Sequence, residues 1–215
     1  MHSIAGTLPG DSGLLDQPPF RAPHHGISAA GLIGGGARPG PGEISLAHRG
    51  VLFLDELPEF RRDVLEGIRQ PLEERRVCIV RVGGASIFPS DFLLIAAMNP
   101  CRCGRAGEPG YACRQGLGCV ERYQARISGP LLDRIDLQIE VPAVSAADLV
   151  LPTASEGSAE VRARVAAARA IQVERFTALK HPRARTNADC DGSLLEDIAA
   201  PDHAGRTRLR EAADA

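Results

Sequence analysis

The chain has 215 residues, of which 44% are hydrophobic and 24% charged, and its formal net charge is −2. That length and apolar content suffice for one sizeable core, or for a core with a small appendage. The near-neutral charge and 4% aromatic content exclude a global basic field or a base-stacking surface, so any nucleic-acid contact must be local. No apolar run is long enough to cross a bilayer and no signal peptide is recognisable, so we expect a cytoplasmic globular protein.

The first 49 residues are rich in glycine and proline. The stretch from Gly31 to Glu43 indicates an extended loop or irregular hairpin. From Val51 to Leu54, four apolar residues follow without polar alternation, which predicts a strand buried on both faces of a parallel sheet. After Pro58, apolar residues recur at the spacing of an amphipathic helix: Phe60, Val64, Leu65, Ile68 and Leu72.

Three further β elements are expected in the next part of the chain. Two β-rich runs around Gly83-Gly84 predict a hairpin over Arg76–Phe88. A second buried strand is predicted over Phe92–Met98, and a third over Leu137–Val141, closed by Pro142. A glycine-rich, cysteine-bearing loop from 101 to 119 and a polar helix leading to Gly129 separate these two strands.

The composition shifts beyond Pro142. Residues 143–157 are typical of a linker, and Ser158 is a suitable N-cap for an Ala/Arg-rich helix that continues to Phe176. Its apolar face would carry Val161, Val165 and Ala168. Two weaker helical stretches follow at 194–198 and 206–213. We therefore expect an α/β core over residues 1–142 and a small helical unit over 158–215.

Adjacent carboxylates end the first predicted strand. Asp55 and Glu56 would lie at the carboxyl edge of the sheet, where open α/β folds bind ligands. Mg²⁺ in such sites takes one or two carboxylates together with phosphate oxygens, and a second carboxylate can polarise an attacking water. The alternative is a strand that ends in a charged turn.

Asn99 ends the second predicted strand as Asp55 ends the first, so both polar tips would lie at one sheet edge. An amide in that place could orient a water against a phosphate, and the alternative is a simple Asn-Pro turn. Arg134 precedes the third predicted strand, where a guanidinium could reach a phosphate as an arginine finger.

Four of the six cysteines fall within 19 residues of one loop: Cys101, Cys103, Cys113 and Cys119. Four thiolates suit tetrahedral Zn²⁺, and a loop without a core gains order from such a clamp. The alternative is free or redox-active thiols. Cys78 and Cys190 are expected to be ordinary thiols, and the adjacent pair His24-His25 is expected to structure its loop rather than to bind a metal.

Arg61, Arg62, Arg75 and Arg76 are for the most part typical of a solvated face. Arg76 and Arg81 differ because they flank the predicted hairpin, where they could meet DNA phosphates.

Several longer segments resemble one family. They are GVLFLDELPEF, AAMNPCRCG, ARISGPLLDRIDLQIEVP, PFRAPHHGISAAGLIGGG and RPGPGEISLAHRG. Together they are similar to the Mg-chelatase-like AAA+ ATPases of the ComM/YifB type, strongly over residues 2–142 and weakly over 158–215. The resemblance implies an α/β fold, the three-layer AAA+ P-loop-type core followed by a helical lid. It also implies ATP and Mg²⁺ as ligands and assembly into a ring, in this family a hexamer.

The resemblance also implies roles for single residues. Asp55 would hold Mg²⁺ and Glu56 would be the base for water, as the Walker B pair. Asn99 matches sensor 1, and Arg134 matches the arginine finger that serves a neighbouring subunit. The hairpin over Arg76–Phe88 matches the pre-sensor-1 hairpin, which lies in the central pore of related helicases, and residues 26–43 match the helix-2 insert.

One family motif is missing from these 215 residues. The P-loop, G-x-x-x-x-G-K-[ST], holds phosphates through backbone amides and a lysine. The glycine-rich run from Gly34 to Gly40 has no lysine, and Pro39 removes an amide donor. We therefore expect a fragment that begins after the P-loop and ends before sensor 2, and that hydrolyses no ATP alone.

Three functions compete at this point. The first is part of a ring-forming motor that acts on DNA in competence or recombination, as a branch-migration-type helicase. The second is the motor subunit of a metal chelatase, which drives Mg²⁺ insertion into a porphyrin. The third is a non-catalytic, zinc-stabilised oligomerisation module. The cysteine loop and the PFRAPHH stretch favour the first.

Overall fold

The structure, a computed structural model, describes residues 1–8, 15–36, 39–81, 84–106, 116, 118–141, 156–181, 184–190 and 192–213. The chain divides into two compact units, Met1–Ala143 and Val144–Ala215, which are described separately. Among the described residues, no helix combines the length and apolar character needed to span a membrane.

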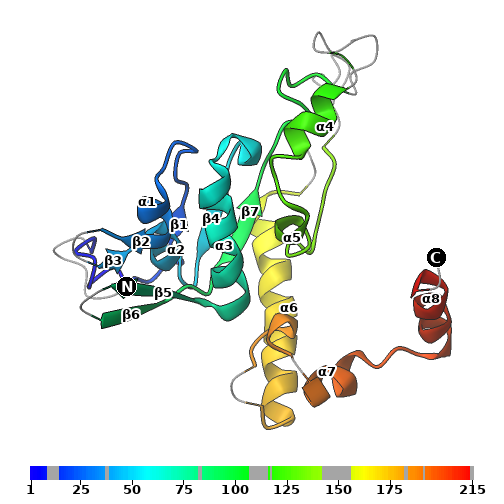
Figure 1. The fold of residues 1–215 in the computed structure, drawn as a ribbon. Coiled ribbons are helices and arrows are strands. Elements are labelled where there is room, and N and C mark those ends of the chain that lie inside the picture. The colour runs from blue at the N-terminus through cyan, green and yellow to red at the C-terminus, as the bar shows by residue number, and fades with distance from the viewer. Residues whose placement is uncertain are drawn as a thin grey trace. The chain divides into compact units, whose positions relative to one another are not determined.

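A three-stranded parallel sheet forms the centre of the first unit (Figure 1). Its order is β1 (Phe20–Arg21), β4 (Val51–Leu54) and β7 (Leu93–Ala96). In register, Phe20 pairs with Val51, and Leu54 pairs with Ala96. This confirms a mixed α/β fold with a parallel sheet. Strand β4 has the predicted bounds, β7 is shorter than the predicted run of residues 92–98, and β1 was not predicted because two residues carry no periodic signal.

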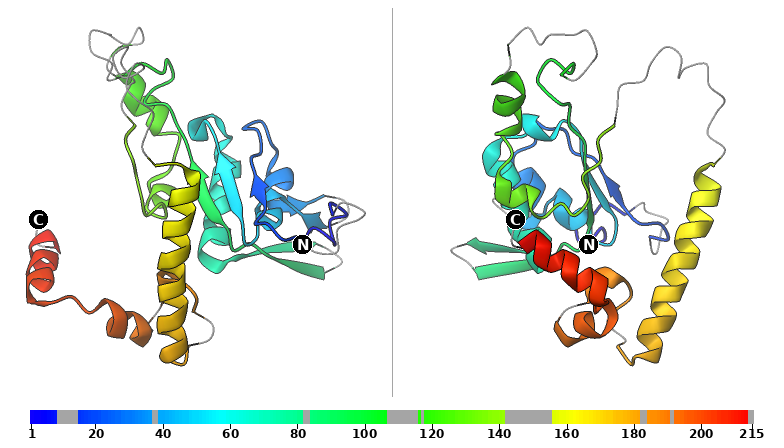
Figure 2. Two further views of the ribbon diagram at one scale, coloured as in Figure 1. Left: turned by 180° about the vertical axis from the view of Figure 1, so that it is seen from behind. Right: turned by 90° about the vertical axis from the view of Figure 1, so that its right-hand side faces the viewer.

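Among the described residues of this unit, one face of the sheet is well covered and the other is not. Leu52 and Leu54 are fully buried, whereas Phe20, Leu93 and Ile95 on the opposite face are 63%, 59% and 42% exposed. The left view of Figure 2, which is turned by 180° from Figure 1, looks onto the side of the sheet away from α3. Val51 and Phe53 of β4 are only half-buried, so among the described residues β4 is fully buried on one face alone, the face on which α3 packs. The described residues of this unit thus form the sheet and one helical layer.

The helical layer is built around α3 (Arg62–Glu74). Val64, Leu65 and Ile68 are buried against the sheet, as their spacing predicts. Phe60 is buried too, but it lies before the helix, at the end of the 3-10 turn η1 (Leu57–Glu59).

The glycine-rich stretch folds into an irregular hairpin with two short helices, which the sequence did not predict. These elements are α1 (Ala29–Ile33), β2 (Gly34–Gly35), β3 (Gly40–Pro41) and α2 (Glu43–Leu46). Strands β2 and β3 pair antiparallel. Ser28 caps α1 by accepting the Gly31 N–H at 3.1 Å, and Leu32 and Ile44 join the core.

The predicted hairpin is confirmed as β5 (Arg76–Arg81) and β6 (Gly84–Pro89). Val77 and Ile79 face the core, whereas Val80 and Ile87 are 71% and 61% exposed. The base of the hairpin is thus anchored while part of its apolar surface faces outwards.

Helices α4 (Gly118–Gln124) and α5 (Gly129–Leu132) follow the cysteine loop. The strand predicted over residues 137–141 is wrong, since this segment has no sheet pairing in the part of the chain that the structure describes. A strand needs a neighbour for its hydrogen bonds, and here three alternate apolar side chains are more than 80% exposed instead: Leu137, Ile139 and Val141.

The second unit contains α6 (Ser158–Ala178), the 3-10 turn η3 (Asn187–Asp189), α7 (Gly192–Ala199) and α8 (His203–Ala213). Its small core joins Phe176, Ala184 and Leu194.

The start of α6 differs from the prediction by one residue. Gly157 is the N-cap in place of Ser158, and its N–H donates to Glu160 Oε2 at 2.9 Å. The predicted apolar face also stays open, with Val161 and Val165 38% and 47% exposed. Of the predicted linker, residues 143–155 lie outside the described residues.

Candidate functional site

The carboxyl ends of β4 and β7 lie side by side. Ala97 N–H donates to the Leu54 carbonyl at 2.9 Å, and Leu57 N–H donates back to the Ala97 carbonyl at 3.0 Å. These two bonds bracket the Asp55-Glu56 turn and hold it against the segment that leads to Asn99. All three polar residues are exposed. The parallel register therefore places the predicted carboxylates and the predicted amide at one sheet edge, where ligands bind in open α/β folds.

Glu56 has a left-handed backbone conformation, with φ 52° and ψ 46°. For a residue with a Cβ this costs about 1–2 kcal/mol. The Glu56 N–H donates to Asp55 Oδ1 at 2.9 Å, and the buried Leu57 and Pro58 fix the turn from the other side. Strain of this kind often occurs at functional sites, although Arg49, Arg75 and Lys180 share the positive φ here.

His25 joins this edge from the loop after β1. Its Nδ1 lies 3.1 Å from Glu56 Oε2, and its ring packs edge-on against Phe60 with centroids 6.3 Å apart. His24 stacks beside it and accepts the Gly26 N–H at 3.0 Å, which structures the loop as predicted. The role of His25 was missed, because its position at a strand end is visible only once β1 is known.

Arg134 lies elsewhere in the unit. Its guanidinium is ion-paired with Glu73 and donates to the Pro130 carbonyl at 2.9 Å. Glu73 is in the last turn of α3, a helix roughly 20 Å long whose first turn follows the Asp55-Glu56 turn. The structure thus brings Asp55 and Glu56 together with the strand end before Asn99, but it does not bring Arg134 to them.

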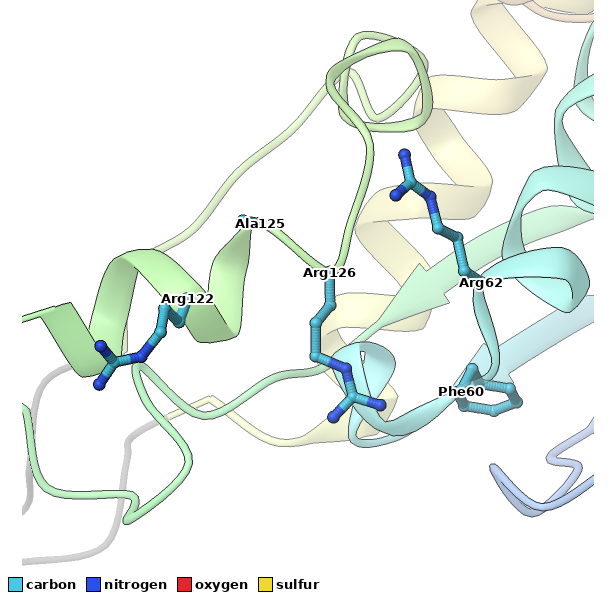
Figure 3. Close-up of a pocket in the computed structure, with 5 residues that line it drawn as sticks. All are labelled: Phe60, Arg62, Arg122, Ala125 and Arg126. Carbon is cyan, nitrogen blue, oxygen red and sulfur yellow. The ribbon is translucent and has the colours of Figure 1, made fainter. Parts of the chain in front are cut away.

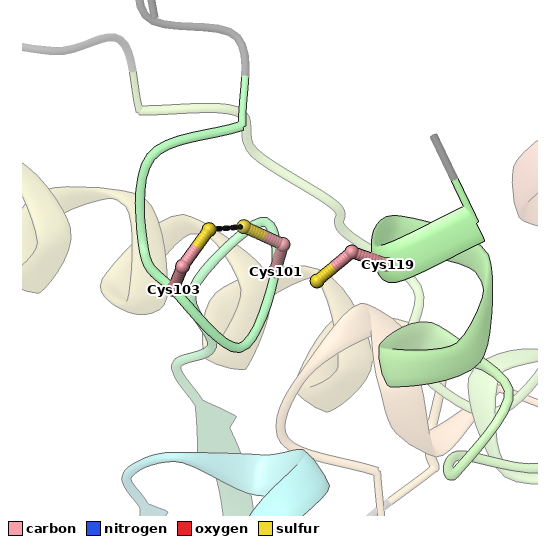
Figure 4. A group of neighbouring side chains, drawn as sticks. All are labelled: Cys101, Cys103 and Cys119. Atoms are coloured by element: carbon pink, nitrogen blue, oxygen red, sulfur yellow. Dashed lines mark hydrogen bonds between the residues drawn. The ribbon is translucent and has the colours of Figure 1, made fainter. Parts of the chain in front are cut away.

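Three of the four loop cysteines converge. The Sγ atoms of Cys101, Cys103 and Cys119 all lie within 4.8 Å of one another (Figure 4). Cys101 and Cys119 are buried, Cys103 is exposed, and Cys113 lies outside the described residues. The pKa of Cys101 is lowered to about 6, chiefly by its hydrogen bond with Cys103 and further by backbone N–H groups, against the opposing effect of burial.

The two hairpin arginines have different surroundings. Arg76 is ion-paired with Glu74 at 3.0 Å. Arg81 ends β5 beside the glycine hairpin, where a Cβ on Gly35 would lie 3.2 Å from its Nη2. Both side chains are exposed, although Arg81 lies on the same face of β5 as Val77 and Ile79.

A small cationic pocket lies between α3 and the end of α4 (Figure 3). It measures about 260 Å³ and is lined by Phe60, Arg62, Arg122, Ala125 and Arg126. Arg126 is ion-paired with Glu59 at 3.0 Å, which connects the segment after α4 to the turn after Glu56.

Residues 1–149 match the family described as magnesium chelatase, subunit ChlI, and residues 155–215 match the C-terminal part of the same subunit. The chain belongs to this family. The predicted resemblance to Mg-chelatase-like AAA+ proteins of the ComM/YifB type is confirmed by its relatives.

Competence protein ComM of Haemophilus influenzae is 51% identical over 160 residues, covering 74% of this chain and 31% of ComM. YifB of Escherichia coli is 48% identical over 164 residues, with 74% and 31% covered. An uncharacterized protein of Mycobacterium tuberculosis is 42% identical over 221 residues, covering 100% of this chain and 42% of that protein. The chain thus spans less than half the length of these relatives.

Among solved structures, NtrX from Brucella abortus in complex with ADP aligns with a TM-score of 0.38 at 20% identity. The alignment covers 55% of this chain and 24% of NtrX. The family assignment rests on the sequence relatives.

Proposed function

We propose that this chain supplies the Walker B, sensor 1 and arginine-finger part of a ring-forming, Mg-ATP-dependent AAA+ motor. The observation that carries the proposal is the in-register pairing of β4 and β7. This pairing and the two hydrogen bonds on either side of Asp55 and Glu56 hold these residues next to the strand end before Asn99. Membership of the Mg-chelatase family supports it.

Each residue has one role in this proposal. Asp55 holds Mg²⁺, and Glu56 takes the proton from the attacking water. Asn99 orients that water against the γ-phosphate. The lysine and amide cradle for the phosphates are not among these 215 residues, so a P-loop unit must supply them and this chain alone hydrolyses no ATP.

Arg134 acts across a subunit boundary in the proposed ring, which we take to be a hexamer. Its place at the far end of α3 from Glu56 fits a residue that serves the site of a neighbour. An arginine finger is worth about a thousandfold or more in rate.

The proposed substrate is DNA, bound through the hairpin arginines Arg76 and Arg81. The name of the relative ComM, a competence protein, and the exposed position of both arginines support this choice. The alternative is the motor subunit of a metal chelatase, which the family description supports. Retention on single-stranded DNA, against retention on a porphyrin-chelatase partner, discriminates the two.

The test of the ATPase assignment is a mixing assay. A P-loop-containing relative whose own arginine finger has been replaced is combined with this chain, co-assembly is measured by light scattering, and phosphate release is followed. We expect partial recovery of activity in mixed rings, and loss of that recovery with Arg134→Ala. Activity from this chain alone, or mixed rings without recovery, would contradict the proposal.

A further inference from the structure

The cysteine cluster joins two separate elements of the first unit. Cys101 and Cys103 follow directly after Asn99-Pro100, and Cys119 lies at the start of α4. Fifteen residues separate Cys103 from Cys119 in the sequence, yet the three sulfur atoms lie within 4.8 Å of one another. Thiolates at ~2.3 Å from a tetrahedral zinc ion lie roughly 3.8 Å apart, so small side-chain shifts are enough to ligate one ion.

The surroundings of the sulfur atoms also suit a cation. Cys101 and Cys119 are 0% and 2% exposed, and among the described residues neither belongs to the main hydrophobic cluster. Closely spaced thiolates repel one another unless a cation lies between them.

A disulfide explains the cluster less well. The Cys101 and Cys103 sulfur atoms are 2.9 Å apart, beyond the length of a covalent S–S bond of about 2.05 Å. A disulfide between these two residues would also leave Cys119 without a role in the cluster.

We propose that Cys101, Cys103 and Cys119 bind one structural Zn²⁺ ion, which ties the segment after Asn99 to α4. These three thiolates fill three of the four positions of a zinc tetrahedron. The ion braces one side of the candidate site, because Arg126, just after α4, is ion-paired with Glu59 beside the Glu56 turn. This metal site does not depend on the proposed ATPase activity.

The test is elemental analysis of the tag-free chain after exhaustive dialysis. We expect about one zinc per chain, and loss of that zinc in the Cys101→Ser and Cys119→Ser variants. Cys78→Ser and Cys190→Ser are the matched controls, since these thiols lie outside the cluster, and both variants should keep the metal.

Cobalt replacement keeps the proposal testable if the serine variants fail to fold. Co²⁺ in the unaltered protein should give sulfur-to-metal charge-transfer absorption and the intense visible bands of a tetrahedral thiolate site. A folded chain free of zinc would overturn the proposal. So would zinc that survives Cys101→Ser, iron in place of zinc, or a Cys101–Cys103 disulfide found by mass spectrometry.

Discussion

His25 Nδ1 lies 3.1 Å from Glu56 Oε2, so the loop after β1 reaches the carboxylate that follows β4. Two features therefore determine where the Glu56 carboxylate lies. They are the left-handed backbone of Glu56 and the imidazole that reaches it from a neighbouring strand end. A carboxylate that must accept a proton from water needs a fixed position, because misplacement by even 1 Å can lower a rate by about a hundredfold. If Glu56 is the proposed base, this contact gives His25 a positioning role toward it.

The first prediction concerns this contact, in a ring-competent protein that joins the chain to a P-loop unit. His25→Ala should lower kcat for ATP about tenfold or more, with little change in KM, because Glu56 would be misplaced after nucleotide has bound. His25→Asn should retain most of the activity, since its amide nitrogen replaces Nδ1. His25→Gln is the matched control, because its amide replaces Nε2 instead.

Steady-state kinetics of the three variants check this prediction. Equal losses in His25→Asn and His25→Gln would mean that the ring packs against Phe60 rather than positioning Glu56. Unchanged kcat in His25→Ala would remove His25 from the site altogether.

The second prediction concerns pH and His48. Burial lowers the pKa of His48, assisted by Arg49 and the N-terminus and opposed by Asp91, and its Nδ1 accepts the Asp91 N–H at 3.1 Å. Since the folded pKa lies below the ordinary value of 6.5, the unfolded chain binds more protons near and below that pH. The free energy of unfolding should therefore fall as the pH falls from about 7 towards 5.

Urea unfolding at a series of pH values measures this effect. His48→Asn keeps an acceptor for the Asp91 N–H but does not titrate, so the fall should be shallower. The control is His181→Asn, at an exposed position of the second unit, which should leave the pH dependence unchanged. An equally steep fall in His48→Asn would assign it to other groups.

The third prediction concerns the hairpin. Arg76→Ala combined with Arg81→Ala should weaken single-stranded DNA binding and flatten the slope of log K against log salt by about 1.4, at ~0.7 for each phosphate that the protein no longer neutralises. The control pair Arg61→Ala and Arg69→Ala removes the same charge from α3 and its N-cap, where both arginines are paired with carboxylates of their own segment. Fluorescence anisotropy at several salt concentrations gives both quantities. Equal changes in the two double variants would indicate a net-charge effect.

The sequence predicted the elements whose signal is local. The apolar run of β4, the helical spacing on α3 and the paired β-rich runs of β5 and β6 each carry their own periodicity. Strand β1 is only two residues long and depends on pairing with β4, so no pattern reveals it. Residues 137–141 show the opposite case. Apolar and polar residues alternate there as in a strand, but among the described residues no strand lies beside them to pair with.

The candidate site divides in the same way. Asp55, Glu56 and Asn99 were predicted because each follows an apolar run, and parallel strands end at one edge. The contact of His25 with Glu56 could not be predicted, because it depends on where the loop after β1 lies. For Cys101 and Cys119 the sequence predicted a possible zinc site from the residue types. It did not predict how close the two sulfur atoms lie, because spacing within a loop does not determine that distance.

The last prediction concerns the ion pair between Arg134 and Glu73. If Arg134 serves a neighbouring subunit, its guanidinium must leave Glu73 when the ring closes. Both side chains are partly exposed, so the pair is worth about 0–1 kcal/mol, and removing it should raise the fraction of free guanidinium by at most about fivefold. Glu73→Gln should therefore increase the recovery of phosphate release in mixed rings, within that limit, and barely change the free energy of unfolding.

Glu74→Gln is the matched control, because Glu74 pairs with Arg76 instead. A fall in recovery with Glu73→Gln alone would mean that the carboxylate orients the finger rather than retaining it. In that case Arg134 would act from the position it already has, held by Glu73 and the Pro130 carbonyl.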